Sequence, residues 1–287
     1  MSAGVAGTGN SVLQLEVFTS PTRPIGEDGR RTFSPITSIL VFGHENAVLV
    51  DAQFFKEDVQ TLGDMIERVG RRLNTIFVTH GHGDHYFGAG KLLKRFPEAR
   101  CVATPDVVAY VQGHRDQDVT VWSGLFGDRI ELPTALPAPM DGDTIVLEGR
   151  ELKAIQMEQG DIAPTAVLHV PELAAVIAGD VAYNGIHQMM AFSGPAEWDR
   201  WTASIESIRS LKPKIVIAGH KKPDAGDDEV DRILDGTRDY IRDFAEAAKS
   251  ASSVEILVGA MRAKYPDRGN LTTLMISADA ALKRRTH

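Results

Sequence analysis

The sequence predicts an α/β fold in which helices pack outside paired sheets, and three observations support this prediction. Short apolar segments of strand length alternate with stretches whose apolar residues recur every three or four positions. No low-complexity segment or linker interrupts this alternation, so residues 1–287 are expected to form a single domain. Several strands end in a histidine or an aspartate, which is where open α/β sheets place their ligand sites.

The first half of the chain begins with strands and then alternates strands with helices. Residues 20–35 are rich in Pro, Gly and Arg and predict a mobile loop or a hairpin. Apolar residues at helical spacing predict a helix that Gly70 ends, and a second helix over 86–96 that Pro97 ends. The strands predicted in this half are 12–18, Thr37–Phe42, 47–51 and 74–79.

The second half of the chain also alternates strands with helices, and it is predicted to end in helices over about 227–287. Its predicted strands are Thr144–Leu147, 166–170, 174–178 and 214–218. Its predicted helices are 198–211, 230–244, Val254–Lys264 and 272–283.

Composition and charge narrow the function classes. The net charge is −8, and nucleic-acid binding needs a basic face, so a nucleic-acid partner is not expected. No run reaches the roughly 20 apolar residues that span a bilayer, so no membrane partner is expected. Residues 1–10 predict a disordered tail and no secretory signal. Cys101 is the only cysteine and reads as a small core hydrophobe, which fits a reduced, cytoplasmic setting.

The densest chemical signal is the segment 79–85, Thr-His-Gly-His-Gly-Asp-His. It places three of the nine histidines and one carboxylate in a single loop between a predicted strand and a predicted helix. Imidazoles and carboxylates are ligands for divalent ions such as zinc, and the glycines let the backbone bend tightly enough to aim them inward. Asp180 and His220 each follow an apolar strand in the same way, so these residues together predict a metal site.

These motifs resemble the metallo-β-lactamase superfamily of hydrolases. The matching pieces are Val50-Asp51, the segment 79–85, Ala178-Gly179-Asp180 and Ala218-Gly219-His220, in the same order and at similar spacing. The resemblance extends from about Leu13 to about Pro223. It implies a four-layer αβ/βα sandwich, here with extra C-terminal helices, and two divalent metal ions at one edge of the two sheets.

The resemblance also implies the ligand set. Asp51 is expected to lie next to the ligands without binding a metal itself. The implied ligands are His80 and His82 for one metal, Asp84, His85 and His220 for the other, and Asp180 bridging both.

One departure from the superfamily pattern concerns the third ligand of the first metal. The family has a histidine where this chain reads Gly160-Asp161-Ile162, so Asp161 either replaces it as a ligand or is a turn residue beside a weakened site. Substitution is favoured because a carboxylate oxygen binds the same ions. The added negative charge favours harder ions, so zinc is the first expectation, with Mn²⁺ and Fe²⁺ as the alternatives.

The expected reaction is attack of a metal-bridging hydroxide on the carbonyl of a small molecule, with Asp84 carrying the proton. Tyr183 lies three residues after Asp180, a spacing found in acyl-homoserine lactonases of this superfamily, and it favours a lactone or an ester as substrate. The alternatives are a thioesterase, a β-lactamase-type amide hydrolase, and an oxidoreductase of the same fold that uses a single iron.

Several residues near these motifs have no settled role in the sequence. Lys221 or Lys222 either binds a substrate carboxylate or is solvated, and His187 is close enough to Asp180 in sequence to enter the pocket. A homodimer is also left open. Apolar residues expected in loops, or shortly after Asp51, form either a pocket wall, the core or a dimer contact: Phe54, Phe55, Trp122, Leu125, Phe126, Met189, Met190 and Phe192.

Overall fold

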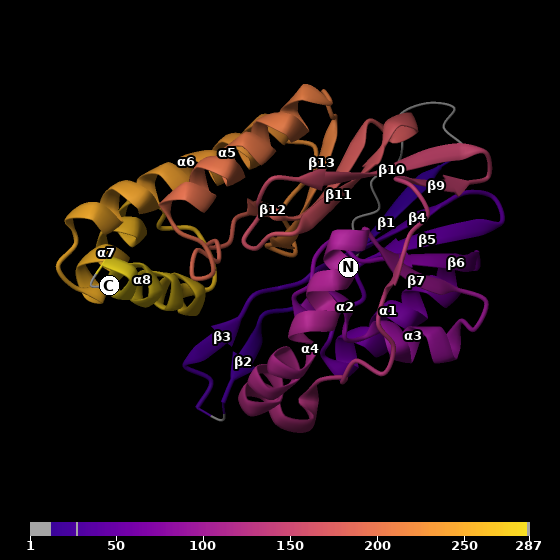
Figure 1. Cartoon of the computed structure of the whole chain (residues 1–287), viewed down its shortest axis with the longest axis horizontal. Helices are drawn as coiled ribbons and strands as arrows, with labels where there is room; N and C mark the ends of the chain where they lie inside the picture. The colour runs from indigo at the N-terminus through magenta and orange to yellow at the C-terminus, as the bar shows by residue number, and fades with distance from the viewer. Residues whose placement is uncertain (1–12, 27, 286–287) are drawn as a thin grey trace.

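The computed structural model describes residues 13–26 and 28–285, and these residues form four layers in the order helix, sheet, sheet, helix (Figure 1). The predicted tail at 1–10 lies outside the described residues, and so does Val12, the first residue of the predicted strand 12–18. The α/β sandwich expected from the alternation of strands and helices is therefore confirmed.

The first sheet has six strands in the order β1-β4-β5-β6-β7-β8. The pairs β1/β4 and β4/β5 are antiparallel, whereas β5 to β8 run parallel, so the carboxyl ends of β5 and β6 meet at one edge. The bounds of these strands are Gln14–Thr19, Thr37–Phe42, Asn46–Val50, Arg72–Phe77, Arg100–Ala103 and Ala138–Pro139 for β1, β4, β5, β6, β7 and β8.

The second sheet has five strands in the order β13-β12-β11-β10-β9, with only β12/β13 parallel. Its strands are Thr144–Leu147, Arg150–Met157, Thr165–Val170, Ala175–Asn184 and Ile215–Lys221 for β9 to β13. A separate hairpin pairs β2 (Arg23–Ile25) with β3 (Arg31–Phe33), which settles the segment 20–35 as a hairpin.

Helices cover the outer face of each sheet (Figure 1). The first sheet carries α1 (Lys56–Val69), α3 (Ala89–Arg95) and α4 (Pro105–Phe126). The second sheet carries α5 and α6, with α7 and α8 beyond them; their bounds are Pro195–Ser210, Val230–Ser250, Val254–Lys264 and Leu271–Arg285. None of the helices within 13–26 and 28–285 is both long and apolar enough to cross a membrane.

The core consists of three buried clusters, one in each space between neighbouring layers. Side chains on a strand alternate between its two faces, so each sheet contributes to two of these clusters. In β5, for example, Val48 and Val50 face the second sheet, whereas Ala47 and Leu49 face the helices. The cluster between the sheets fixes how their edges align, and therefore fixes the site described below.

Two predictions about helices need correction. The expectation that Trp122, Leu125 and Phe126 lie in a loop is wrong, because these residues form the last turns of α4. Residues 112–117 of that helix are exposed and polar, which hides its apolar periodicity, although Thr104 followed by Pro105 is a start signal. The predicted helix 86–96 is divided into α2 (Gly83–Tyr86) and α3, with a change of direction between them.

Candidate metal centre

The seven predicted metal ligands come together at one edge of the two sheets. Those of the motif 79–85 lie directly after β6 or in α2, at the carboxyl end of a parallel strand. Asp180 and His220 lie on the neighbouring parallel strands β12 and β13, and Asp161 lies on the loop between β10 and β11. The first sheet and its α2 therefore supply four of the side chains, and the second sheet supplies three.

The side chains fall into two groups whose nitrogen and oxygen atoms lie within 4.8 Å of one another. One group contains His80, His82, Asp161 and Asp180, and the other contains Asp84, His85 and His220. Asp180 also reaches the second group, since its Oδ1 is 3.4 Å from His85 Nε2 and its Oδ2 is 3.2 Å from His220 Nε2. The geometry thus places Asp180 between two candidate sites.

Asp51 and Thr79 aim two of the imidazoles from behind. Asp51 Oδ2 is 2.8 Å from His85 Nδ1, and the Asp51 carboxylate also accepts from the backbone and hydroxyl of Thr79. The Thr79 hydroxyl lies 3.0 Å from His80 Nδ1. With its Nδ1 engaged, each ring presents Nε2 to the centre, which is the usual way a partner behind a histidine fixes it for a metal.

Three of the atoms that point into the centre lack a hydrogen-bond partner within the described part of the chain. His80 Nε2, His85 Nε2 and Asp180 Oδ1 are buried without a hydrogen bond. A buried polar atom left in this state costs about 1–3 kcal/mol, so three in one place point to a missing ligand. Donors around a tetrahedral zinc at 2.0–2.1 Å lie roughly 3.3 Å apart, and the separations around Asp180 in the second group match this value. These residues fit a pair of divalent ions.

The pKa shifts of Asp180 and His80 also fit a metal site. Burial alone would raise the pKa of Asp180, but the imidazoles of His220, His85 and His80 outweigh burial and hold that pKa well below its usual range. Burial and the neighbouring His85 hold the pKa of His80 well below its usual value, which leaves a neutral ring able to bind a metal. Asp180 is therefore an anion at neutral pH, as a carboxylate shared by two cations must be.

Asp161 faces the first group. Its Oδ2 lies 2.9 Å from His82 Nδ1, and its Oδ1 lies 3.9 Å from His80 Nε2. Burial lowers the pKa of His82, but the Asp161 carboxylate more than offsets burial and raises that pKa to about 9. A divalent ion that enters here must therefore displace a proton from His82.

Tyr183 and Cys101 are both buried, but of the two only Tyr183 is hydrogen-bonded to a candidate metal ligand. The Tyr183 hydroxyl donates to Asp180 Oδ2 over 2.9 Å, and burial together with that carboxylate raises the pKa of Tyr183 well above its usual value. The phenol is therefore a neutral donor at the centre. Burial raises the pKa of the Cys101 thiol to about 12, which confirms it as an inert core residue.

Gly219 makes room for the bridging position. Residues 179 and 219 lie where the register between β12 and β13 shifts, so the two strands approach closely beside Asp180. A Cβ atom on residue 219 would lie 2.1 Å from Asp180 Oδ1 and 2.7 Å from the carbonyl carbon of Gly179. Only glycine fits here without moving backbone.

A narrow cavity of about 30 Å³ opens onto the centre, with room for one or two water molecules. Three of the residues suggested as a pocket wall line it, namely Trp122, Met189 and Phe192. Phe54, Phe55, Phe126 and Met190 are buried in the core, and Leu125 is exposed.

Phe33, Ser34 and Thr273 also line the cavity and were missed from the sequence. Phe33 and Ser34 lie at the end of the β2–β3 hairpin, and Thr273 lies on α8. The sequence predicted the elements that carry them, a loop or hairpin over 20–35 and a helix over 272–283, but not their place at the cavity.

The lysines that follow His220 do not line the cavity. The Lys221 ammonium is buried and donates to Asp227 over 2.6 Å and to the carbonyl of Ala225. The Lys222 side chain packs beside Gly185. His187 pairs with the hydroxyl of Tyr240 at 3.0 Å and lies outside the cavity lining, so it does not join the centre.

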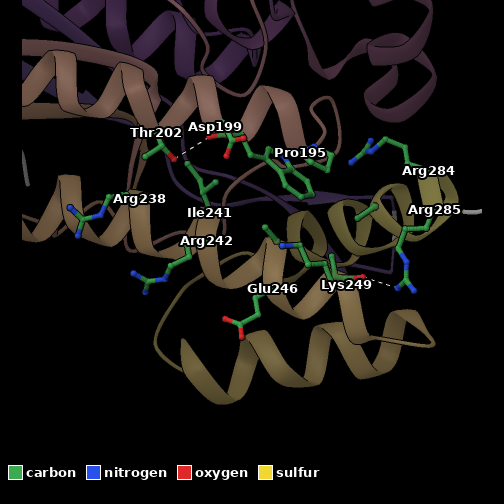
Figure 2. A pocket seen from close by; sticks show the side chains of 14 residues that line it. Pro195, Asp199, Thr202, Arg238, Ile241, Arg242, Glu246, Lys249, Arg284 and Arg285 are labelled. Atoms are coloured by element: carbon green, nitrogen blue, oxygen red, sulfur yellow. Dashed lines mark hydrogen bonds between the residues drawn. The ribbon is translucent and has the colours of Figure 1, made fainter.

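A larger cavity of about 950 Å³ lies on the outer side of the second sheet, between α5, α6 and α8 (Figure 2). Its rim is basic, and at least two of its cations are engaged: Arg238 pairs with Asp235, and Arg285 donates to the carbonyls of Ala248 and Ala251. None of its lining residues belongs to the two ligand groups. The chemistry is therefore concentrated at the small cavity.

Comparison with known proteins gives a consistent picture. Residues 31–220 match the family model described as the metallo-beta-lactamase superfamily. A hydroxyacylglutathione hydrolase from Synechococcus sp. (strain CC9902) is 27% identical over 150 residues, which are 52% of this chain and 47% of that protein. The match thus spans about half the length of this relative.

Solved structures share the fold at low sequence identity. A metallo-beta-lactamase family protein from Thermus thermophilus superposes with a TM-score of 0.65 at 16% identity, covering 94% of this chain and 93% of that one. A beta-lactamase domain protein from Burkholderia ambifaria gives 0.58 at 15% identity, covering 95% and 86%. A metallo-beta-lactamase from Pontibacter korlensis gives 0.57 at 17% identity, covering 84% and 99%.

Proposed function

Because the chain belongs to the metallo-beta-lactamase superfamily, a family of metallo-hydrolases, we propose that it is a dinuclear hydrolase that cleaves a small carbonyl substrate, with a lactone or an ester favoured. The observation that carries this proposal is the pair of ligand groups around Asp180, with His80 Nε2, His85 Nε2 and Asp180 Oδ1 left without partners. We propose His80, His82 and Asp161 for one metal, Asp84, His85 and His220 for the other, and Asp180 for both.

Zinc is the proposed metal, with Mn²⁺ and Fe²⁺ as alternatives because three of the seven ligands are carboxylates. When bound, such a pair of ions lowers the pKa of water to near neutrality and polarises a substrate carbonyl. The chain's own contribution is to hold this chemistry in a buried place, since the most exposed of the seven side chains, His82, is only 8% exposed.

Two residues are proposed to handle protons and orientation. The Asp84 carboxylate lines the cavity, so it is placed to take a proton from the attacking water and pass it to the leaving group. Tyr183 lines the same cavity and carries a neutral hydroxyl that donates to Asp180 Oδ2, and its proposed role is to redirect this one hydrogen bond to the substrate carbonyl or leaving oxygen when a substrate binds.

A thioester is the second candidate substrate, because the curated relative is a hydroxyacylglutathione hydrolase. A hydrolysis panel of lactones, esters, thioesters, β-lactams and phosphodiesters, each run with Zn²⁺, Mn²⁺ or Fe²⁺, separates these possibilities. Lactone or ester activity that falls about 100-fold or more in Tyr183→Phe supports the favoured version. Phosphodiesterase activity alone overturns it.

The ligand role of Asp161 can be tested by metal analysis. Asp161→Ala is expected to lower the metal content from two ions per chain towards one, whereas Asp161→His is expected to keep two, because an imidazole restores the third ligand. Asp118→Ala is a matched control, since Asp118 is a half-buried carboxylate on α4 outside both ligand groups. Unchanged metal content in Asp161→Ala would refute the assignment.

A further inference from the structure

The cavity over the candidate metal centre contains no lysine or arginine side chain among the residues that the structure describes. Twelve residues line it, and none is a lysine or an arginine. Three of the twelve are the carboxylates Asp84, Asp161 and Asp180. Neither of the cations nearest in sequence lines the cavity: the Lys221 ammonium is bound to Asp227, and Lys222 lies outside the lining.

The proposed ligand set further reduces the attraction for an anion. Two divalent ions carry four positive charges, and the carboxylates of Asp84, Asp161 and Asp180 offset three of them. A histidine at position 161 would leave two charges unopposed instead of one. A substrate carboxylate entering this cavity would therefore lose its hydration, would find no lysine or arginine to pair with, and would be attracted by one unopposed positive charge where a histidine at position 161 would leave two.

The walls of the cavity are apolar and aromatic. The rings of Phe33 and Trp122 meet edge to face with centroids 5.4 Å apart, and the Phe192 ring lies 4.9 Å from the ring of His82. Met189 completes this side of the cavity. The polar groups beyond the ligands are the hydroxyls of Tyr183, Ser34 and Thr273, which can bond a carbonyl or an alcohol oxygen and carry no charge.

Phe192 forms the solvent-exposed side of the cavity. Its side chain is 57% exposed and lies on the irregular segment between β12 and α5. A cavity of about 30 Å³ is far smaller than the roughly 300–1,000 Å³ of small-molecule sites, so a substrate must displace this ring to enter. The surface exposed by that displacement consists of aromatic side chains and Met189.

We propose that the substrate is uncharged, that it carries an apolar acyl or alkyl group against Phe33, Trp122 and Phe192, and that carboxylate-bearing substrates are disfavoured. This inference rests on the proposed hydrolase function, but it makes a separate claim about charge. It separates this chain from hydrolases whose substrates bear a carboxylate.

The test compares two esters that differ only by a methyl group or a carboxylate at the end of the acyl chain: para-nitrophenyl pentanoate and the para-nitrophenyl monoester of glutaric acid. With the metal-loaded protein, kcat/KM is expected to be at least about tenfold higher for the neutral ester, and the ratio is expected to shrink as salt screens the carboxylates. Phe192→Lys should narrow the ratio by placing a cation at the cavity. Phe192→Leu should not, and neither should Met275→Lys, which adds the same charge at an exposed position on α8 outside the lining.

A binding measurement separates failure of this inference from failure of the hydrolase proposal. Quenching of Trp122 fluorescence is followed on adding methyl heptyl ketone or its analogue whose chain ends in a carboxylate, with Trp122→Phe as the control for the signal. Tighter binding of the neutral ketone supports the inference even if neither ester is cleaved, in which case only the hydrolase proposal fails. Equal or tighter binding of the carboxylate, or equal or faster cleavage of the glutaric monoester, overturns it.

Discussion

At the scale of single residues, Asp51 supports two imidazoles of the centre although it does not line the cavity. It is buried, adopts a left-handed backbone conformation with φ of 59°, and contacts His85 directly and His80 through Thr79. A non-glycine residue in this conformation is uncommon, and here it turns the carboxylate under the ligands.

Asp51→Asn is expected to weaken zinc binding by about 10- to 100-fold, because the amide keeps one acceptor oxygen and loses the other. Competition with a chromogenic chelator measures this change. Asp227→Asn is the control, since Asp227 is also buried but pairs with Lys221 away from the centre. An affinity equal to that of the unaltered protein would show that Asp51 does not position the ligands.

Glu148 is a residue whose effect on stability depends on pH. Its carboxylate accepts hydrogen bonds from the backbone N–H groups of His44, Glu45 and Asn46, which lower its pKa to about 2. A depressed carboxyl pKa stabilises the folded state above the usual pKa near 4.5, and this stabilisation is lost as pH falls towards 2.

Glu148→Gln should therefore lower the free energy of unfolding at pH 7, and the difference from the unaltered protein should narrow between pH 4.5 and about 2. Urea unfolding at several pH values measures the difference. Glu151→Gln, which alters an exposed carboxylate on the neighbouring strand, is the control. A difference that stays constant with pH would mean that the charge of Glu148 is not responsible.

The sequence predicted the site residues that are marked by the pattern of their own segment. Six of the seven candidate ligands lie in the segment 79–85, at Asp180 or at His220, so strand ends predicted that they would converge, whereas Asp161 was expected only from the resemblance to the superfamily. Phe33 and Thr273 could not be, because their place at the cavity depends on a hairpin and a helix that meet across more than 200 positions. Neither segment contains a sequence pattern that predicts the contact between the hairpin and the helix.

At the scale of elements, α8 and the β2–β3 hairpin close one side of the cavity together. The Thr32 backbone N–H donates to the Thr272 hydroxyl over 2.9 Å. Asn270 precedes α8 with φ of 60°, and its amide is oriented so that the oxygen accepts from the backbone N–H of Ser34 over 2.9 Å and the nitrogen donates to the carbonyl of Thr32 over 2.8 Å. This side chain thus ties the helix to the hairpin.

Asn270→Gly is expected to cost about 1–3 kcal/mol of unfolding free energy, because the hydrogen bonds are lost while the backbone conformation remains easy for glycine. Asn270→Ala should cost more, since alanine is strained at this φ. Both variants should raise KM for the substrate because Phe33, Ser34 and Thr273 lose their support. Urea unfolding and steady-state kinetics measure the two effects, and an unchanged KM would show that this tie does not shape the cavity.

The sequence analysis predicted no helix over the range of α4, and this helix shows why amphipathicity can mislead. Its first turns are buried through Val107, Val108 and Val111, whereas the middle of the helix faces solvent. Apolar periodicity is therefore visible only at its two ends. The Thr-Pro start signal marks such a helix better than apolar periodicity does.

At the scale of the whole molecule, the candidate metal centre is formed by both halves of the sandwich. The first sheet and its α2 contribute His80, His82, Asp84 and His85, and the second sheet contributes Asp161, Asp180 and His220. Alternation of strands and helices predicted the layers, but the pairing of each strand with its neighbours depends on contacts distant in sequence and could not be read from it.

Divalent ions should therefore stabilise the entire fold. A ligand that binds only the folded state stabilises it by about 2.7 kcal/mol at 100 times its Kd, so the melting temperature is expected to rise with added zinc and to fall after chelation. Differential scanning calorimetry measures this shift. Identical melting temperatures for the chelated and zinc-loaded protein would contradict a centre that links the two sheets.

The close approach at Gly219 makes this centre vulnerable at a position that carries no chemistry. A methyl group on residue 219 would clash with Asp180 Oδ1 on the neighbouring strand. It would also clash with the main chain of Gly179, which cannot move without disturbing the strand. Gly219→Ala should thus disable the protein while every coordinating side chain keeps its identity. All seven candidate ligands are unchanged in this variant. A comparison of the ligand residues alone would therefore not detect the displacement of the Asp180 carboxylate.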